Sequence, residues 1–150
     1  MSDSPPVLPK GLPTPAPMPD GLDAPYWEAT RRHALVAQRC QQCRRFQWTA
    51  EWICHRCHSF ELGFEPVPGE ARLFSWQRPW HPVHPALREA CPYVVIVVEL
   101  PEADGIRMVG NLVDPPEGEI PIGAKVVPVF EDHDDGEPPF TLVQWRLSGR

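Results

Sequence analysis

Short apolar runs, each followed by turn-forming residues, fill the second half of the chain. The runs contain six to eight residues and occupy positions 71–76, 93–100, 106–113, 125–131 and 140–147. Stretches rich in Pro, Gly and Asp separate them, as in strands joined by turns. The run at 93–100 is β-branched and apolar on both faces, which is typical of a central strand. Five short strands in about eighty residues predict a small closed or nearly closed barrel.

The first half of the chain has a different pattern. Residues 23–33 predict a short helix, because Asp23 can cap its N-terminus and Pro25 falls in the first turn, where its missing N–H costs nothing. Residues 34–39 then predict a strand. One side of the helix carries the side chains of Tyr26, Trp27 and Thr30.

A proline-rich stretch precedes this helix. Seven of the 21 prolines lie within residues 1–22, which excludes regular helix or sheet and leaves little to bury. The composition predicts a disordered arm, and the alternative is an arm that lies extended on a partner protein. We therefore divide the chain into this arm (1–22), a helix with a ribbon (23–62) and a barrel domain (63–150). Residues 63–69 have the turn chemistry of a connector.

Four of the five cysteines form two close pairs. The pattern is Cys40-x2-Cys43, ten residues, then Cys54-x2-Cys57. Each pair can place two sulfurs on one side of a tight turn, and two pairs complete the tetrahedron that zinc prefers. Four protein ligands leave no position open for a substrate, so we expect one structural zinc ion that stabilises a ribbon too small for its own core. The alternative, two redox dithiols, needs a βαβ context that the flanks lack.

The remaining histidines and the fifth cysteine give little support for catalysis. His55 and His58 flank a ligand, but four cysteines already complete the site, so we expect exposed imidazoles. An enzyme would use His81 or His84 as a general base near Cys91. No nucleophile elbow, Gly-rich phosphate loop or carboxylate pair accompanies them. We expect a rigid proline-bracketed loop, a packed thiol and no catalytic residue.

Charge is unevenly distributed along the chain. The net charge of −6 combines −3 over residues 1–30, +5 over 31–58 and −8 over 59–150. The positive segment surrounds the cysteines, so its arginines can offset the negative charge of four thiolates. The arginines beside the ligands are Arg39, Arg44, Arg45 and Arg56.

The chain also lacks the apolar stretches that membrane insertion or export requires. No apolar run approaches the ~20 residues of a membrane span. Prolines stand where a signal peptide would have a basic head and an apolar stretch. We expect a soluble, cytoplasmic protein, whose reduced thiols favour metal binding over disulfides.

Taken together, these segments resemble the DUF35 family, whose members join a rubredoxin-like zinc ribbon to an OB-fold. The likeness covers about residues 23–147 and includes the order of Tyr-Trp helix, four-cysteine ribbon and five-strand barrel. It implies a mostly β fold with an N-terminal helix, a zinc ribbon and a five-stranded OB-fold barrel. The segments that carry the resemblance are 71–76, His84-Pro85, 92–99, 108–113 and 120–123.

The resemblance also implies a function. Members of this family usually are non-catalytic subunits of acyl-CoA enzymes in lipid metabolism, including steroid degradation. We expect a hetero-oligomer in which this chain supports a thiolase-superfamily enzyme, meaning a thiolase, an acyltransferase or a steroid side-chain aldolase. A MaoC-type enoyl-CoA hydratase is the alternative partner. A single-stranded nucleic-acid-binding module is another alternative, but the acidic barrel would repel a phosphate backbone.

Two segments are candidates for contact with such a partner. Aromatic residues on a short helix beside an arginine-rich segment have the composition of an interface centre. We therefore predict that Tyr26, Trp27 and Arg31 bind the partner enzyme. The alternative is that Trp27 packs near Phe64 and fixes the ribbon to the barrel. We further predict that the barrel leans over the acyl-CoA entrance of the enzyme, with the loop that carries His81 and His84 at that entrance.

Overall fold

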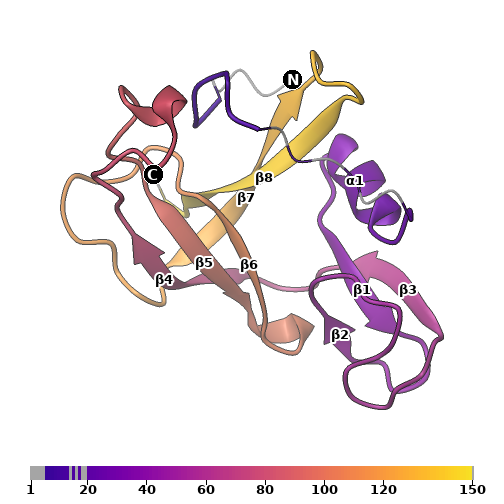
Figure 1. The fold of residues 1–150 in the computed structure, drawn as a ribbon. Helices are drawn as coiled ribbons and strands as arrows, with labels where there is room; N and C mark the ends of the chain where they lie inside the picture. Colours follow the sequence, from indigo (N-terminus) through magenta and orange to yellow (C-terminus); the bar gives the residue numbers. More distant parts are fainter. Residues whose placement is uncertain (1–5, 14, 16, 18–19, 150) are drawn as a thin grey trace.

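A computed structural model describes residues 6–13, 15, 17 and 20–149. The chain folds into a small sheet and a larger, strongly curved one, with one α-helix between them (Figure 1). None of the helices in this part of the chain has the length and apolar content of a membrane span. The elements are α1 (Ala24–Arg31), β1 (Val36–Cys40), β2 (Phe46–Gln47), β3 (Leu62–Pro66), β4 (Ala71–Gln77), the 3-10 helix η1 (Pro85–Leu87), β5 (Val95–Leu100), the 3-10 helix η2 (Pro101–Ala103), β6 (Ile106–Asn111), β7 (Lys125–His133) and β8 (Phe140–Leu147).

The small sheet contains three antiparallel strands in the order β2-β1-β3. The strand predicted before the first cysteine is confirmed and runs into it. The connector predicted over residues 63–69 is shorter than expected, because β3 pairs with all five residues of β1, from Val36 opposite Pro66 to Cys40 opposite Leu62. Turn-forming residues at 63–66 are therefore built into the sheet, where a long-range partner decides their conformation.

The large sheet contains the five strands predicted from the apolar runs, in the order β6-β5-β4-β7-β8. Its two ends approach each other, since Leu112 forms a parallel bridge to Trp145 and the N–H of Val113 donates to the carbonyl of Trp145 at 2.7 Å. The sheet thus curls into a barrel around a core that includes Ile96, Val98 and the fully buried Trp145. The predicted fold class, a helix and ribbon followed by an OB-like barrel, is confirmed.

Helix α1 packs against β8 and touches the ribbon through Trp48. The ring centroids of Trp27 and Phe140 lie 6.4 Å apart in an edge-to-face arrangement, and those of Tyr26 and Trp48 lie 4.8 Å apart. Asp23 precedes the helix as predicted, but its side chain makes no capping bond to the backbone. Its carboxylate accepts instead from the indole N–H of Trp27 at 2.8 Å. The helix is thus fastened to the domains on both sides of it.

The described part of the proline-rich arm lies on the barrel. The N–H of Val7 donates to Glu131 Oε2 at 3.1 Å, and Lys10 Nζ lies 2.7 Å from the carboxylate of Asp135. Pro6 and Val7 also border a cavity of about 390 Å³ beside the start of β5. Several residues of the segment 1–22 lie outside the described part of the chain, and for these the disordered arm stays a prediction.

Candidate functional site

The four predicted zinc ligands come together at one end of the ribbon. All four Sγ atoms lie within 4.8 Å of one another, and the pairs Cys40–Cys57 and Cys43–Cys54 are each 3.6 Å apart. Sulfurs at ~2.3 Å around a tetrahedral zinc ion stand roughly 3.8 Å from each other. The spacing therefore fits a four-coordinate zinc ion, which these four cysteines could hold.

The two cysteine turns are built alike. In the first, the N–H of Arg44 donates to the carbonyl of Cys40 at 3.0 Å; in the second, the N–H of His58 donates to the carbonyl of Cys54 at 3.1 Å. Arg44 and His58 each adopt a left-handed conformation, with φ of 62° and 61°. That conformation closes each turn directly after its second cysteine. The chain thus presents both sulfur pairs from matched turns.

Backbone N–H groups help to prepare the sulfurs as thiolates. Those of Cys57 and Arg56 lower the pKa of the Cys54 thiol to about 6, and the thiolate is the form that binds metal. At Cys57 the N–H of Ser59 favours the thiolate, but burial and hydrogen bonds with the other three cysteines outweigh it and raise the pKa to about 12. Thiolates packed this closely repel one another, and a cation at their centre removes that repulsion.

Three of the four arginines beside the ligands form ion pairs with carboxylates of the chain. Arg39 and Arg44 both form ion pairs with Glu65, each at 2.7 Å, and Arg45 pairs with Asp104. That these arginines also offset the charge of the thiolates stays a prediction. Their contacts join β1 and the first cysteine turn to β3 and to the barrel. Of the four, Arg56 is the one without an ion pair in the described part of the chain.

Sequence reasoning missed two buried glutamines beneath the second cysteine turn. The amide of Gln47 donates to Gln38 Oε1 at 2.6 Å and to the carbonyl of Ile53 at 3.2 Å. Gln38 donates to the carbonyl of Glu51 at 3.0 Å and accepts from its N–H at 2.9 Å. Gln47 Oε1 accepts from the N–H of His55 at 3.0 Å. Side-chain amides thus hold this loop in place of an apolar core.

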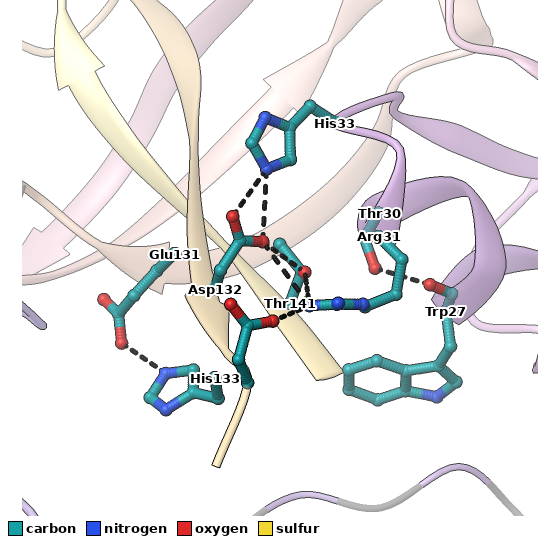
Figure 2. Close-up of polar contacts among 9 residues, drawn as sticks. Trp27, Thr30, Arg31, His33, Glu131, Asp132, His133 and Thr141 are labelled. Carbon is teal, nitrogen blue, oxygen red and sulfur yellow. Dashed lines mark hydrogen bonds and ion pairs between the residues drawn. The ribbon is translucent and has the colours of Figure 1, made fainter. Parts of the chain in front are cut away.

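Two of the residues predicted to bind a partner are used within the chain. Trp27 contacts Phe140 of β8 and so joins the helix to the barrel. The alternative prediction named Phe64 as the partner of Trp27. Figure 2 shows Arg31 beside the β7–β8 hairpin, where Nη1 lies 2.8 Å from the carboxylate of Asp134 and 3.4 Å from the hydroxyl of Thr141. Both side chains fix α1 to the barrel.

The third of these residues, Tyr26, faces the core. Its ring packs against the buried cluster of the barrel and ribbon, and burial raises the pKa of its phenol to about 12. Contact between this helix and a partner therefore stays a prediction. Only the side chains of α1 that point outward are available for it.

The loop between β4 and β5 carries His81 and His84. His84 Nδ1 accepts from the N–H of Ala86 at 3.2 Å and so begins the 3-10 helix η1. His81 is exposed. In the described part of the chain no hydrogen bond joins either imidazole to Cys91. His84 thus caps the 3-10 helix, and the absence of a catalytic role stays a prediction.

Large apolar side chains are exposed on the ribbon and on the loop between β4 and β5. Trp52, Ile53 and Phe60 flank the second cysteine turn, and Trp80 and Val83 lie in the loop. The sequence did carry a signal for the ribbon residues. Trp52 and Ile53 are adjacent large apolar residues in a ribbon that is too small to bury them in a core of its own. Exposed apolar clusters of this kind mark contact surfaces.

Two family models match segments of this chain. Residues 27–63 match the family described as "ChsH2, rubredoxin-like zinc ribbon domain", and residues 64–131 match "ChsH2, C-terminal OB-fold domain". A DUF35 domain-containing scaffold protein of Methanocaldococcus jannaschii is 31% identical over 114 residues, which cover 70% of this chain and 76% of that protein. The fold and site define a ribbon with a metal site joined to an OB-fold barrel. The chain belongs to the DUF35 family.

Two solved structures and a longer relative are also similar. The structure named "Ltp2-ChsH2(DUF35) aldolase" contains a chain that is 33% identical with a TM-score of 0.74, covering 90% of this chain and 99% of that one. A DUF35 protein of unknown function from Sulfolobus solfataricus shares the fold at 14% identity and a TM-score of 0.57, over 83% and 84% of the two chains. A probable enoyl-CoA hydratase alpha subunit of Thermomonospora curvata is 37% identical over 138 residues. The match covers 92% of this chain but 41% of that subunit.

Proposed function

We propose that this chain is a non-catalytic subunit that binds one structural zinc ion and supports a thiolase-superfamily enzyme acting on acyl-CoA thioesters. The observation that carries the proposal is the likeness to the DUF35 chain of an aldolase complex over 99% of that chain. Because the likeness spans ribbon and barrel together, it supports a shared role of the whole unit rather than of one domain. We place this hetero-oligomer in the cytoplasm, where reduced thiols remain free to bind zinc.

The internal contacts support a role as a rigid scaffold. Trp27 and Arg31 fix α1 to the barrel. Glu65 and Asp104 form ion pairs with the arginines around the first cysteine turn. The zinc ion would be held by Cys40, Cys43, Cys54 and Cys57, would supply folding energy to the ribbon and would leave no coordination position for acyl-CoA. The outward side chains of α1 and the loop of His81 and His84 remain candidate contacts with the enzyme and its acyl-CoA.

A second candidate partner is a MaoC-type enoyl-CoA hydratase. The observation in its favour is the 37% identity to a probable enoyl-CoA hydratase alpha subunit. This chain spans about two fifths of the length of that relative, so the name describes a longer protein. A nucleic-acid-binding role has less support, because carboxylates already pair with three arginines of the ribbon and the barrel segment is strongly acidic.

Co-expression tests the proposal. The tagged chain is produced together with each thiolase-superfamily enzyme and each MaoC-type hydratase of its own genome, and complexes are isolated by affinity and size-exclusion chromatography. We expect a stable complex of defined stoichiometry with a thiolase-superfamily enzyme and no turnover of acyl-CoA by the isolated chain. A complex with hydratases alone would select the second candidate. Turnover by the isolated chain that His84→Ala abolishes would show that it is an enzyme.

A further inference from the structure

The second cysteine turn exposes three large apolar side chains. Trp52 is 61% exposed, Ile53 38% and Phe60 78%. The N–H of Cys54 donates to the carbonyl of Ser59 at 2.9 Å, so the residues on either side of this bond, Ile53 and Phe60, occupy neighbouring positions. Trp52 directly precedes Ile53 in the sequence. The three side chains therefore form one apolar surface rather than scattered exposed residues.

The exposure of all three side chains shows that no described element of the chain covers this surface. The loops of the ribbon project away from the barrel strands in Figure 1. The arm and α1 contact the β7–β8 hairpin instead, through Lys10 and Arg31. A partner can thus reach the three side chains without moving any element of this chain.

The surface is rigid although it has no core beneath it. Gln38 and Gln47 are 2% and 5% exposed and hold the backbone of Glu51, Ile53 and His55 through their amides. Both amides are satisfied, so the loop has one preferred shape. Exposed aromatic rings on a backbone fixed in advance lose little conformational freedom on binding, which favours tight association.

The charged side chains beside the surface indicate which charged groups a partner would need at its own surface. Arg39 and Arg44 share the carboxylate of Glu65, and Arg45 pairs with Asp104. Arg56 lies within the second turn, is exposed, and has no carboxylate within ion-pair distance among the described residues. Glu51 and Glu61, which flank the surface in the sequence, are also exposed and have no ion pair among the described residues. An apolar centre whose edge carries unpaired charges of both signs complements an apolar pocket with a charged rim, in which a carboxylate lies opposite Arg56.

We propose that the ribbon tip, defined as Trp52, Ile53, Phe60 and Arg56, docks into such a pocket on the thiolase-superfamily enzyme. This inference rests on the proposed function and names the contact surface. The aromatic rings fill the pocket and exclude water, and Arg56 forms an ion pair at its rim. The buried glutamines keep the tip in its docking shape while the metal site holds the turn closed.

Variants of the full chain test the proposal against the enzyme that the wild-type chain binds in the co-expression experiment. The double variant Trp52→Ser/Phe60→Ser removes the apolar centre, and Arg56→Glu reverses the rim charge. The matched control is Val109→Ser/Ile122→Ser, which removes side chains of the barrel that are 67% and 64% exposed. Dissociation constants are measured by calorimetry, and zinc content and circular dichroism verify that each variant is folded.

We expect the double variant to bind at least tenfold more weakly, since truncating a central aromatic hot-spot residue costs about 2 kcal/mol or more and about 1.4 kcal/mol corresponds to tenfold. Arg56→Glu should slow association and reduce its salt dependence, while the control binds as the wild type does. Unchanged affinity of both tip variants beside a wild-type complex overturns the docking surface and leaves the proposed function standing. The docking surface is also overturned, and the proposed function again stands, if the tip variants abolish only a homodimer of this chain and bind the enzyme as the wild type does. Absence of any wild-type complex overturns the proposed function and this inference together.

Discussion

The ring of Trp27 meets the ring of Phe140 edge-on, with the two centroids 6.4 Å apart. The contact joins the helix before the ribbon to the last strand of the barrel, across more than a hundred residues of sequence. Ribbon and barrel therefore share one packed helix, and the geometry between them depends on this aromatic pair.

Replacement of Trp27 should destabilise the whole unit. Trp27→Ala removes the edge-to-face contact and the hydrogen bond to Asp23, so we expect the free energy of unfolding to fall by about 1–3 kcal/mol. Urea unfolding at pH 7 measures the change. The exposed Trp52 provides a matched control, for which Trp52→Ala should change stability by less than about 0.5 kcal/mol. Equal losses in the two variants would contradict the role given to Trp27.

The contact between Asp132 and His33 predicts a dependence on pH. Burial alone would raise the pKa of Asp132, but the hydroxyl of Thr141, His33 at 2.9 Å and the charge of Arg31 outweigh it and hold the pKa below its ordinary value of 3.8. A lowered pKa in the folded state contributes stability above the unfolded value, and that contribution is lost as the pH falls through the lowered pKa. Figure 2 shows the three partners around the carboxylate.

Asp132→Asn tests this dependence. At pH 7 we expect the variant to be less stable than the wild type by on the order of 1–2 kcal/mol, because hydrogen bonds to a charged carboxylate are lost. The difference should shrink below about pH 4 as the wild-type carboxyl gains its proton. Both proteins lose bound metal alike in acid, so the difference between their urea midpoints isolates Asp132. A difference that stays constant from pH 7 to pH 3 would contradict the argument.

Gly110 lies where the barrel closes. A Cβ at this position would stand 2.7 Å from Cδ1 of Trp145 and 2.8 Å from the carbonyl oxygen of Val143. Because Trp145 is fully buried and the carbonyl belongs to the backbone, neither can move without cost. We expect Gly110→Ala to lower the unfolding free energy by about 1–3 kcal/mol. Gly118→Ala, with no atom within 4 Å of its Cβ, should leave the thermal midpoint nearly unchanged.

Local signals in the sequence were sufficient for the metal site and the strands. Cys40, Cys43, Cys54 and Cys57 come from two tight turns, each of which is encoded by a few consecutive residues. The strands of the barrel are likewise indicated by the pattern of apolar residues within each short run. Sequence alone could therefore give the number of barrel strands and their places along the chain, and the four cysteines that lie together.

Contacts between distant residues could not be predicted in this way. Arg45 pairs with Asp104, 59 positions away, and nothing near either residue indicates the other. The same holds for Gln38 and Gln47, which read as ordinary polar residues until the loop folds over them. The exposure of Trp52 and the partial burial of Trp27 likewise depend on which tryptophan the barrel happens to cover.

The metal site makes its own prediction. Purified protein should contain one zinc ion per chain by elemental analysis, and Cys43→Ser should lose it. Structural zinc contributes on the order of 10 kcal/mol to small ribbons, so we expect the ribbon of this variant to unfold while the barrel keeps its strands, as seen by NMR. Cys91→Ser, outside the site, should retain zinc and fold. A folded ribbon in protein free of zinc would refute the assignment.

Alkaline unfolding should report on Tyr26. Its phenol packs against Trp48 and the core, and burial raises its pKa to about 12 from 10.0. A raised pKa in the folded state contributes stability that is complete below the unfolded pKa and is lost as the pH rises toward the folded one. The wild type should therefore lose up to about 1 kcal/mol per pH unit between pH 10 and 12 from this group. Tyr26→Phe, which keeps the ring and removes the ionisable hydroxyl, should lose less over the same range. Urea unfolding at pH 8, 10 and 11 compares the two proteins, and identical losses would show that the Tyr26 phenol ionises as freely in the folded chain as in the unfolded one.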